Sequence, residues 1–238
     1  MEPPNQEKTD RPPVTDAYTM KKTALVFGAT GLVGSHLVEQ LSNDDRYDRI
    51  LTFTRTPFNS GSRNVVNHII DFDRLEESAG LIRGNEIFCC LGTTIKKAGS
   101  QQNFRKVDLE YPDRIAALGS KNNVRHFLVI SSIGANPESR NFYLQTKGQM
   151  EECIRKQPFS RISILRPSLL LGKRKEFRMG ELLGKGFMKI TGFLLGGSLK
   201  KFRGIQASTV ARAMIRIANG DYGKEIYESD KIAAIGRQ

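Results

Sequence analysis

The chain has 238 residues but no tryptophan, only three cysteines and no long hydrophobic run. Three cysteines are too few for a disulfide framework, which excludes the disulfide-bonded secreted scaffolds and leads us to expect a reducing, cytoplasmic location. No stretch approaches the roughly 18 consecutive apolar residues that a membrane-spanning helix needs. No apolar segment follows the first basic residues, so we expect no secretory signal.

Signals for metal and hydrolase chemistry are also missing. The three histidines, His36, His68 and His126, show no zinc-ligand spacing among them. The sequence has no Gly-x-Ser-x-Gly nucleophile elbow. We therefore expect no metal site and no serine-hydrolase activity.

Positive charge is in excess, because 37 Lys and Arg residues face 25 Asp and Glu residues, a formal net charge of +12. No aromatic-plus-basic RNA motif and no helix-turn-helix pattern accompanies this charge. A binding site for an anionic cofactor, together with a solvated basic surface, explains the excess with fewer assumptions. We therefore expect a small anionic ligand and no nucleic-acid partner.

The chain is predicted to have a tail and one folded domain. Residues 1–20 are rich in proline and polar side chains, which is typical of a disordered tail, and residues 21–238 are expected to form a single NAD(P)-binding domain. Near-continuous apolar runs alternate with helical patterns, which predicts a Rossmann-type α/β fold, doubly wound, with a mainly parallel sheet and helices on both faces. The expected strands are Thr23–Ala29, Arg49–Arg55, Asn67–Phe72, Glu86–Gly92, His126–Gly134, Ile162–Leu171 and Lys224–Glu228, and the expected helices are Leu32–Leu41, Asp73–Leu81, Gln101–Lys121, Phe142–Lys156 and Ser208–Asn219.

Residues 173–203 differ in composition from the rest of the chain, because they are basic, apolar in patches and interrupted by glycines. This composition favours a small lid over the substrate end of the sheet. The alternative is a surface contact with a membrane, since the segment is cationic and partly amphipathic. Its glycines argue against one long interfacial helix, because each costs up to about 1 kcal/mol relative to alanine.

A glycine-rich turn follows the first expected strand and precedes an amphipathic helix. Glycine lets the backbone approach a pyrophosphate, and the helix N-terminus presents free N–H groups to it. The turn therefore predicts dinucleotide binding. The binding residues expected in it are Gly28, Thr30, Gly31, Leu32, Val33 and Gly34.

The end of the second expected strand indicates which dinucleotide is bound. An NAD-specific site places an Asp or Glu there, on the ribose 2′-hydroxyl, whereas this chain has Thr54 and Arg55. A guanidinium can hold a 2′-phosphate bidentately, so the predicted cofactor is NADP(H). Other strand ends expected to line the same crevice are Asp71, Phe72, Leu91, Gly92 and Thr93.

The predicted reaction centre follows the fifth expected strand. Tyr143 and Lys147 are four residues apart, so they share one face of a helix. An ammonium beside a phenol favours the phenolate, which makes the phenol a better acid or base near neutral pH. A serine hydroxyl from the strand end can orient the substrate oxygen, and we choose Ser132, although the sequence does not decide between it and Ser131.

These residues belong to motifs that together resemble the atypical short-chain dehydrogenase/reductases. The match is closer still to the Tat-interacting, metastasis-suppressor family of NADPH-binding proteins and its bacterial relatives, from about Thr23 to the C-terminus. The resemblance implies that Pro167 lines the cofactor and that Arg166 faces the substrate. The motifs are Gly28-Ala-Thr-Gly-Leu-Val-Gly34, Cys90-Leu-Gly-Thr-Thr94, Phe104-Arg-Lys-Val-Asp108, Ser131-Ser132, Tyr143-Leu-Gln-Thr-Lys-Gly148 and Arg166-Pro-Ser-Leu-Leu-Leu-Gly172.

One departure concerns the middle helix, where many active members of that superfamily carry an asparagine in a proton relay. This chain has Asp108 there, and an ionised carboxylate accepts hydrogen bonds but does not donate them. We expect an NADP(H)-dependent oxidoreductase that acts on a small carbonyl or alcohol, with Ser132, Tyr143 and Lys147 as catalytic residues. The alternative is a non-catalytic NADPH-binding regulator that acts through a protein partner. A sugar epimerase or dehydratase is disfavoured, because those relatives usually have a larger C-terminal substrate domain.

Overall fold

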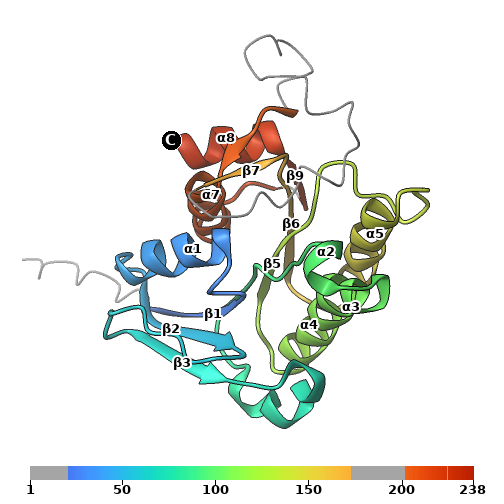
Figure 1. The fold of residues 1–238 in the computed structure, drawn as a ribbon. Helices are drawn as coiled ribbons and strands as arrows, with labels where there is room; N and C mark the ends of the chain where they lie inside the picture. Colours follow the sequence, from blue (N-terminus) through green and yellow to red (C-terminus); the bar gives the residue numbers. More distant parts are fainter. Residues whose placement is uncertain (1–20, 173–201, 224) are drawn as a thin grey trace, which may run out of the picture.

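The fold is a parallel sheet between two layers of helices, as seen in the computed structural model, which describes residues 21–172, 202–223 and 225–238. Seven parallel strands follow the order β3-β2-β1-β4-β5-β6-β9 (Figure 1). Their bounds are Lys22–Phe27 (β1), Tyr47–Thr54 (β2), Val65–Ile69 (β3), Glu86–Cys89 (β4), His126–Ile130 (β5), Arg161–Arg166 (β6) and Ile226–Glu228 (β9). The predicted Rossmann-type fold is confirmed.

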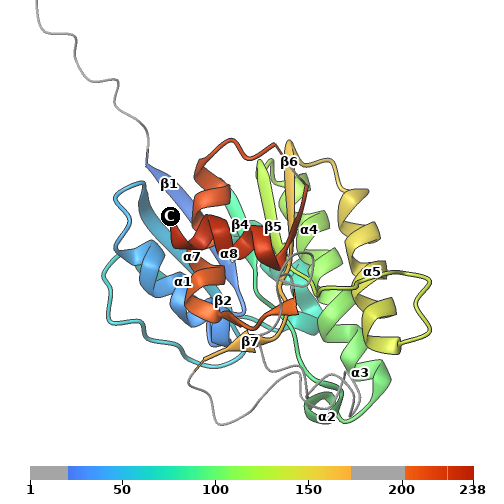
Figure 2. The same cartoon turned by 90° about the horizontal axis from the view of Figure 1, so that it is seen from above.

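Helices cover both faces of this sheet. One face carries α1 (Leu32–Ser42), α7 (Ala207–Asn219) and α8 (Ser229–Arg237), and the other carries η1 (Phe72–Leu81, a 3-10 helix), α4 (Tyr111–Lys121) and α5 (Phe142–Arg155) (Figures 1 and 2). Because both faces are covered, β4 and β5 are buried along their whole length. None of the helices in the described part of the chain is long and apolar enough to cross a membrane.

Two predicted elements are interrupted, and proline accounts for both breaks. The helix predicted over Gln101–Lys121 is divided into α3 (Gln101–Arg105), a π-helical turn η2 (Lys106–Glu110) and α4. Pro112 has no N–H to donate to the carbonyl of Asp108, so the α-helical hydrogen-bond pattern changes to a π-helical turn here, while the backbone stays helical from Gln101 to Lys121. The strand predicted over Ile162–Leu171 ends at Arg166, directly before Pro167, and the short strand β7 (Leu170–Leu171) pairs instead with β8 (Ile205–Gln206).

Some other elements differ from the sequence-based expectation. Two short helices, α2 (Ile95–Ala98) and α8, were not predicted, because each is too short for a clear hydrophobic period. The predicted tail (1–20) and most of the predicted lid (173–201) lie outside the described residues.

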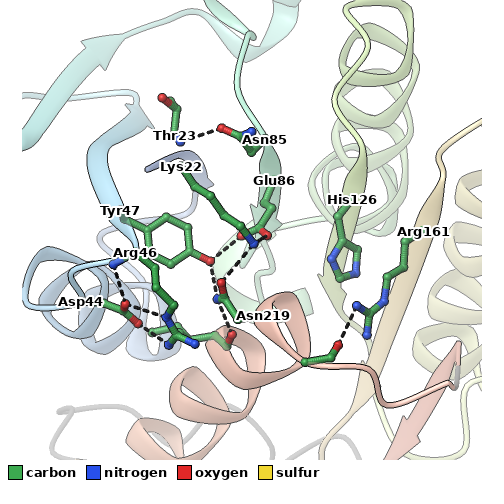
Figure 3. Close-up of polar contacts among 12 residues, drawn as sticks. Lys22, Thr23, Asp44, Arg46, Tyr47, Asn85, Glu86, His126, Arg161 and Asn219 are labelled. Atoms are coloured by element: carbon green, nitrogen blue, oxygen red, sulfur yellow. Dashed lines mark hydrogen bonds and ion pairs between the residues drawn. The ribbon is translucent and has the colours of Figure 1, made fainter. Parts of the chain in front are cut away.

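The first residues of several strands form a polar cluster at the amino edge of the sheet (Figure 3). Lys22 and Tyr47, which begin β1 and β2, both bind Glu86 at the start of β4, and the Lys22 Nζ to Glu86 Oε1 distance is 2.6 Å. Asn219 at the end of α7 donates to the Tyr47 hydroxyl at 2.7 Å. We call Lys22, Tyr47, Glu86 and Asn219 the amino-edge cluster. It links three strands to α7 on the side of the sheet opposite to the strand ends where ligands bind in this type of fold.

A buried histidine begins β5 at the same edge. The His126 ring lies 2.9 Å from the Ser163 hydroxyl. Burial, together with the charges of Arg161 and Lys22, lowers the pKa of His126 to about 3. His126 is therefore neutral at physiological pH and buried in the fold. The described residues contain no group of three or more potential metal ligands.

Candidate functional site

The turn between β1 and α1 can be built only with glycine. Gly28 has φ +85°, a left-handed conformation that side-chain-bearing residues rarely adopt. A Cβ at Gly28 would lie 2.7 Å from the backbone of Cys90, and one at Gly34 would lie 2.1 Å from the Gly28 carbonyl oxygen. The turn therefore brings β1, α1 and the end of β4 into close backbone contact.

The N-terminus of α1 is suited to hold an anion. Its cap residue is Gly31, and within the described chain no side chain caps the helix and no acidic residue lies in its first turn. The free N–H groups and the positive end of the helix dipole are therefore left for a ligand. A dinucleotide pyrophosphate matches these requirements, so the turn fits the predicted cofactor.

A crevice of about 600 Å³ begins at this turn and runs along the carboxyl ends of β1, β2 and β4. Eight of the predicted cofactor residues line it: Gly28, Thr30, Gly31, Arg55, Phe72, Leu91, Gly92 and Thr93. Leu32, Val33 and Gly34 continue from the turn into the first turn of α1. The structure thus brings together residues that are up to 65 positions apart in the sequence, at the edge where ligands bind in open α/β sheets.

The sequence-based prediction missed the opposite wall of the crevice. Lys97 of α2, Asn103 of α3, Lys106 of η2 and Tyr111 of α4 line this wall. Lys106 forms an ion pair with Asp73 at 2.7 Å, and Tyr111 donates a hydrogen bond to the same carboxylate at 2.5 Å. A signal was present, because three lysines lie between positions 96 and 106, but their direction depends on the breaks around α2 and η2.

Asp71 does not line the crevice. It is exposed and caps η1, where its carboxylate accepts a hydrogen bond from the Asp73 N–H at 2.9 Å and one from Arg74 Nε at 3.0 Å. These hydrogen bonds, that from the Asp73 backbone first, lower the pKa of Asp71. Its oxygens are thus bound within η1, and the structure does not support the prediction that Asp71 lines the crevice.

The predicted catalytic pair lies on α5, next to the carboxyl end of β5. Tyr143 is half-buried, and its ring packs against Phe104, with the ring centroids 5.6 Å apart. Lys147 is 4% exposed, and its ammonium lies 2.8 Å from Asp108 Oδ1 and 3.5 Å from the Ile130 carbonyl oxygen. A Cβ on Gly92, which lines the crevice, would lie 3.9 Å from Lys147 Nζ. Lys147 is therefore next to the crevice wall.

Ser131 and Arg166 are both engaged by Glu151, which the sequence-based prediction missed. The Ser131 hydroxyl donates to this buried carboxylate, and the Arg166 guanidinium donates to both of its oxygens, with Nε at 2.9 Å from Oε1. The hydrogen bond to Glu151, together with the charge of Glu228, raises the pKa of Arg166. Glu151 is four residues after Lys147, and this continuation of the helical face was the signal available in the sequence.

Ser132 and Pro167 occupy the ends of β5 and β6. The Ser132 hydroxyl is buried and donates to the Ile133 carbonyl at 3.3 Å, and the Pro167 carbonyl accepts from the Ile133 N–H at 3.1 Å. Ser131 is committed to Glu151, so of the two serines Ser132 has the weaker hydrogen bond and is the freer to exchange it for a ligand.

The sequence matches a known family over residues 28–219, a range that includes the glycine turn, the crevice and α5. The family is described as NAD(P)H-binding. This chain belongs to that NAD(P)H-binding family. It is 32% identical to Protein HTATIP2 of Rattus norvegicus, over 93% of this chain and 92% of the rat protein. It is 33% identical to the mitochondrial Protein FMP52 of Candida albicans, over 90% of this chain and 94% of the fungal one. These relatives confirm the predicted resemblance.

Solved structures share the NAD(P)H-binding fold at low sequence identity. The human epimerase family protein SDR39U1 with NADPH has a TM-score of 0.58 and 17% identity, with 86% of this chain and 72% of that chain covered. MoeE5 in complex with UDP-glucose and NAD has a TM-score of 0.63 and 17% identity, with 90% and 80% covered. The same fold thus occurs with either dinucleotide, and the likeness extends to the fold alone.

The relatives correct one expectation. Five further fungal relatives, like the Candida albicans protein, are named as mitochondrial. The cytoplasmic location inferred from the few cysteines is therefore wrong as a conclusion from the sequence. A scarcity of cysteine excludes a disulfide scaffold, but it does not distinguish among the compartments in which thiols stay reduced.

Proposed function

We propose that this protein is an NADP(H)-dependent oxidoreductase that acts on a small carbonyl or alcohol. The observation that carries the proposal is the position of Tyr143 and Lys147, on a helix beside the crevice that begins at the glycine turn. The bound dinucleotide would supply or accept a hydride. Tyr143 would exchange a proton with the substrate oxygen, Lys147 would bind the cofactor ribose and favour the phenolate, and Ser132 would orient the substrate oxygen.

The choice of NADP(H) rests on charge at the end of β2. Arg55 is exposed and lines the crevice where an NAD-specific site would have a carboxylate. Lys97 and Lys106 on the opposite wall add positive charge to the same crevice. These three side chains favour the cofactor that carries the additional phosphate.

The proposal is tested by measuring NADPH oxidation against a panel of aldehydes and ketones. We expect the wild-type protein to reduce at least one of them and Tyr143→Phe to lose about 10²- to 10⁴-fold in rate, the usual contribution of a general acid. Tyr222→Phe is the matched control, because it makes the same chemical change in the segment that follows α7, at a residue that does not line the crevice, and should retain full activity.

The opposite result would favour the second candidate function. Tight NADPH binding without turnover of any carbonyl, and with no difference between wild type and Tyr143→Phe, would indicate a non-catalytic NADPH-binding regulator.

A further inference from the structure

Asp108 and Lys147 form an ion pair that is almost completely removed from solvent. Their charged atoms are 2.8 Å apart, and the two side chains are 1% and 5% exposed. A buried charge is costly unless it has a partner and further hydrogen bonds. The groups around the pair supply such hydrogen bonds.

The Asp108 carboxylate has a partner for each oxygen. Oδ1 faces the Lys147 ammonium, and Oδ2 accepts a hydrogen bond from the Thr93 N–H at 2.7 Å. A Cβ on Gly92 would lie 3.3 Å from Oδ1, so the loop after β4 passes directly over the pair. Gly92 and Thr93 both line the cofactor crevice. One carboxylate thus connects the crevice wall with the lysine on α5.

Backbone geometry directs Asp108 to this position. It lies in the middle of the π-helical turn η2, which precedes Pro112, and such turns are frequent at functional sites. The groups that face Lys147 are Asp108 from η2, Tyr143 from its own helix and Cys89 from β4. Burial raises the pKa of the Cys89 thiol to about 12, so this thiol carries no charge at neutral pH. Asp108 is therefore the carboxylate that faces the ammonium among the described groups.

We propose that Asp108 is a positioning residue that keeps Lys147 protonated and fixes its ammonium at the cofactor crevice. The inference rests on the proposed role of Lys147 in binding the cofactor. Burial is the largest single influence on Lys147 and by itself would lower its pKa, but opposing effects, that of the Asp108 carboxylate first, leave the pKa above its ordinary value. Without the carboxylate, the effect of burial would lower the pKa of Lys147, and the lysine would lose its proton at lower pH.

The experiment measures dinucleotide affinity between pH 6 and pH 9, with whichever of NADPH and NADH binds the wild-type protein more tightly. At each pH the affinity of a variant is divided by the affinity of the wild-type protein. In this affinity ratio, the effect of the titration of the cofactor phosphate cancels. For Asp108→Asn we expect this ratio to fall at least tenfold from pH 6 to pH 9, because a neutral amine no longer makes charge-assisted hydrogen bonds.

Two variants separate this role from a structural one. Glu110→Gln removes an exposed carboxylate from the same π-helical turn and should keep a ratio near one throughout. Asp108→Asn combined with Lys147→Arg should have a ratio that does not change with pH, because a guanidinium is not deprotonated in this range. If Asp108→Asn weakens binding equally at every pH, Asp108 has only a structural role and the proposal is wrong.

A direct measurement needs no variant that might fail to fold. The ¹³Cε signal of Lys147 in labelled wild-type protein should show a protonated side chain up to at least pH 10, and a titration midpoint below pH 9 would overturn the proposal. Neither experiment uses turnover. If the protein had no oxidoreductase activity, the proposed function would be wrong, but these two experiments would still test the role of Asp108.

Discussion

Residues at the strand ends differ in whether their polar groups already have a buried partner. Arg55 is exposed at the end of β2, so a ligand phosphate can reach its guanidinium without first displacing a buried partner. Ser131 and Arg166 are in the opposite situation, since both are bound to the buried Glu151. These bonds join β5, β6 and α5. The position of Arg166 facing the substrate stays a prediction.

Replacing Arg55 tests the cofactor choice. Isothermal titration of the wild-type protein should give NADPH affinity at least about tenfold above NADH affinity, which is 1.4 kcal/mol. In Arg55→Ala most of this preference should disappear, because the 2′-phosphate loses its bidentate partner. Arg49→Ala, which removes an exposed arginine from the same strand, should keep the preference. Equal affinity of the wild-type protein for both cofactors would refute the argument from Arg55.

Among the elements, α1 depends most on close backbone packing. Gly34 lies in the first turn of this helix, directly over the Gly28 carbonyl. A side chain there would separate the helix N-terminus from the turn, and the N–H groups would no longer converge on one anion.

Gly34→Ala is therefore expected to impair both stability and binding. Its Cβ would lie 2.1 Å from the Gly28 oxygen, and relieving such an overlap costs about 1–3 kcal/mol. Urea unfolding should show this loss, and NADPH titration should show a large drop in affinity. Ser35→Ala, at the next and exposed position, should leave both measurements close to wild type. Unchanged binding in Gly34→Ala would mean that α1 does not hold the pyrophosphate.

At the scale of the whole molecule, the two edges of the sheet have different tasks. The carboxyl ends of the strands border the crevice, whereas the amino ends carry the amino-edge cluster and the neutral His126. Burial and the nearby Glu86 raise the pKa of Tyr47 far above its ordinary value, so its hydroxyl stays protonated and donates to Glu86. This edge stabilises the fold by connecting α7 to the strands.

Tyr47→Phe should separate stability from binding. It removes one of the two donors to Glu86 and one of the two acceptors of the Asn219 amide nitrogen, and losing hydrogen bonds of buried polar groups costs about 1–3 kcal/mol. We expect a lower free energy of unfolding in urea and a dissociation constant for NADPH within about twofold of wild type. Tyr222→Phe should be close to wild type in both. A large loss of NADPH affinity in Tyr47→Phe would show that the two edges are coupled.

The Rossmann-type fold and the glycine turn could be predicted from the sequence, because strand and helix periodicity and the steric freedom of glycine are local properties. It also placed Tyr143 and Lys147 on one helical face, for the same reason. The division of the helix predicted over Gln101–Lys121 follows from Pro112, which local chemistry could have indicated. The lysines of the opposite crevice wall could not be assigned, because their direction depends on that division.

Contacts between polar groups that are distant in the sequence could not be predicted in this way. The carboxylate of Asp108 is 39 positions from Lys147 and that of Glu151 is 20 positions from Ser131, yet each pair is in direct contact. Such contacts depend on how helices pack across the ends of parallel strands, which no local pattern encodes. For that reason the sequence predicted the pair of Tyr143 and Lys147, while the structure showed that the Asp108 carboxylate contacts the lysine.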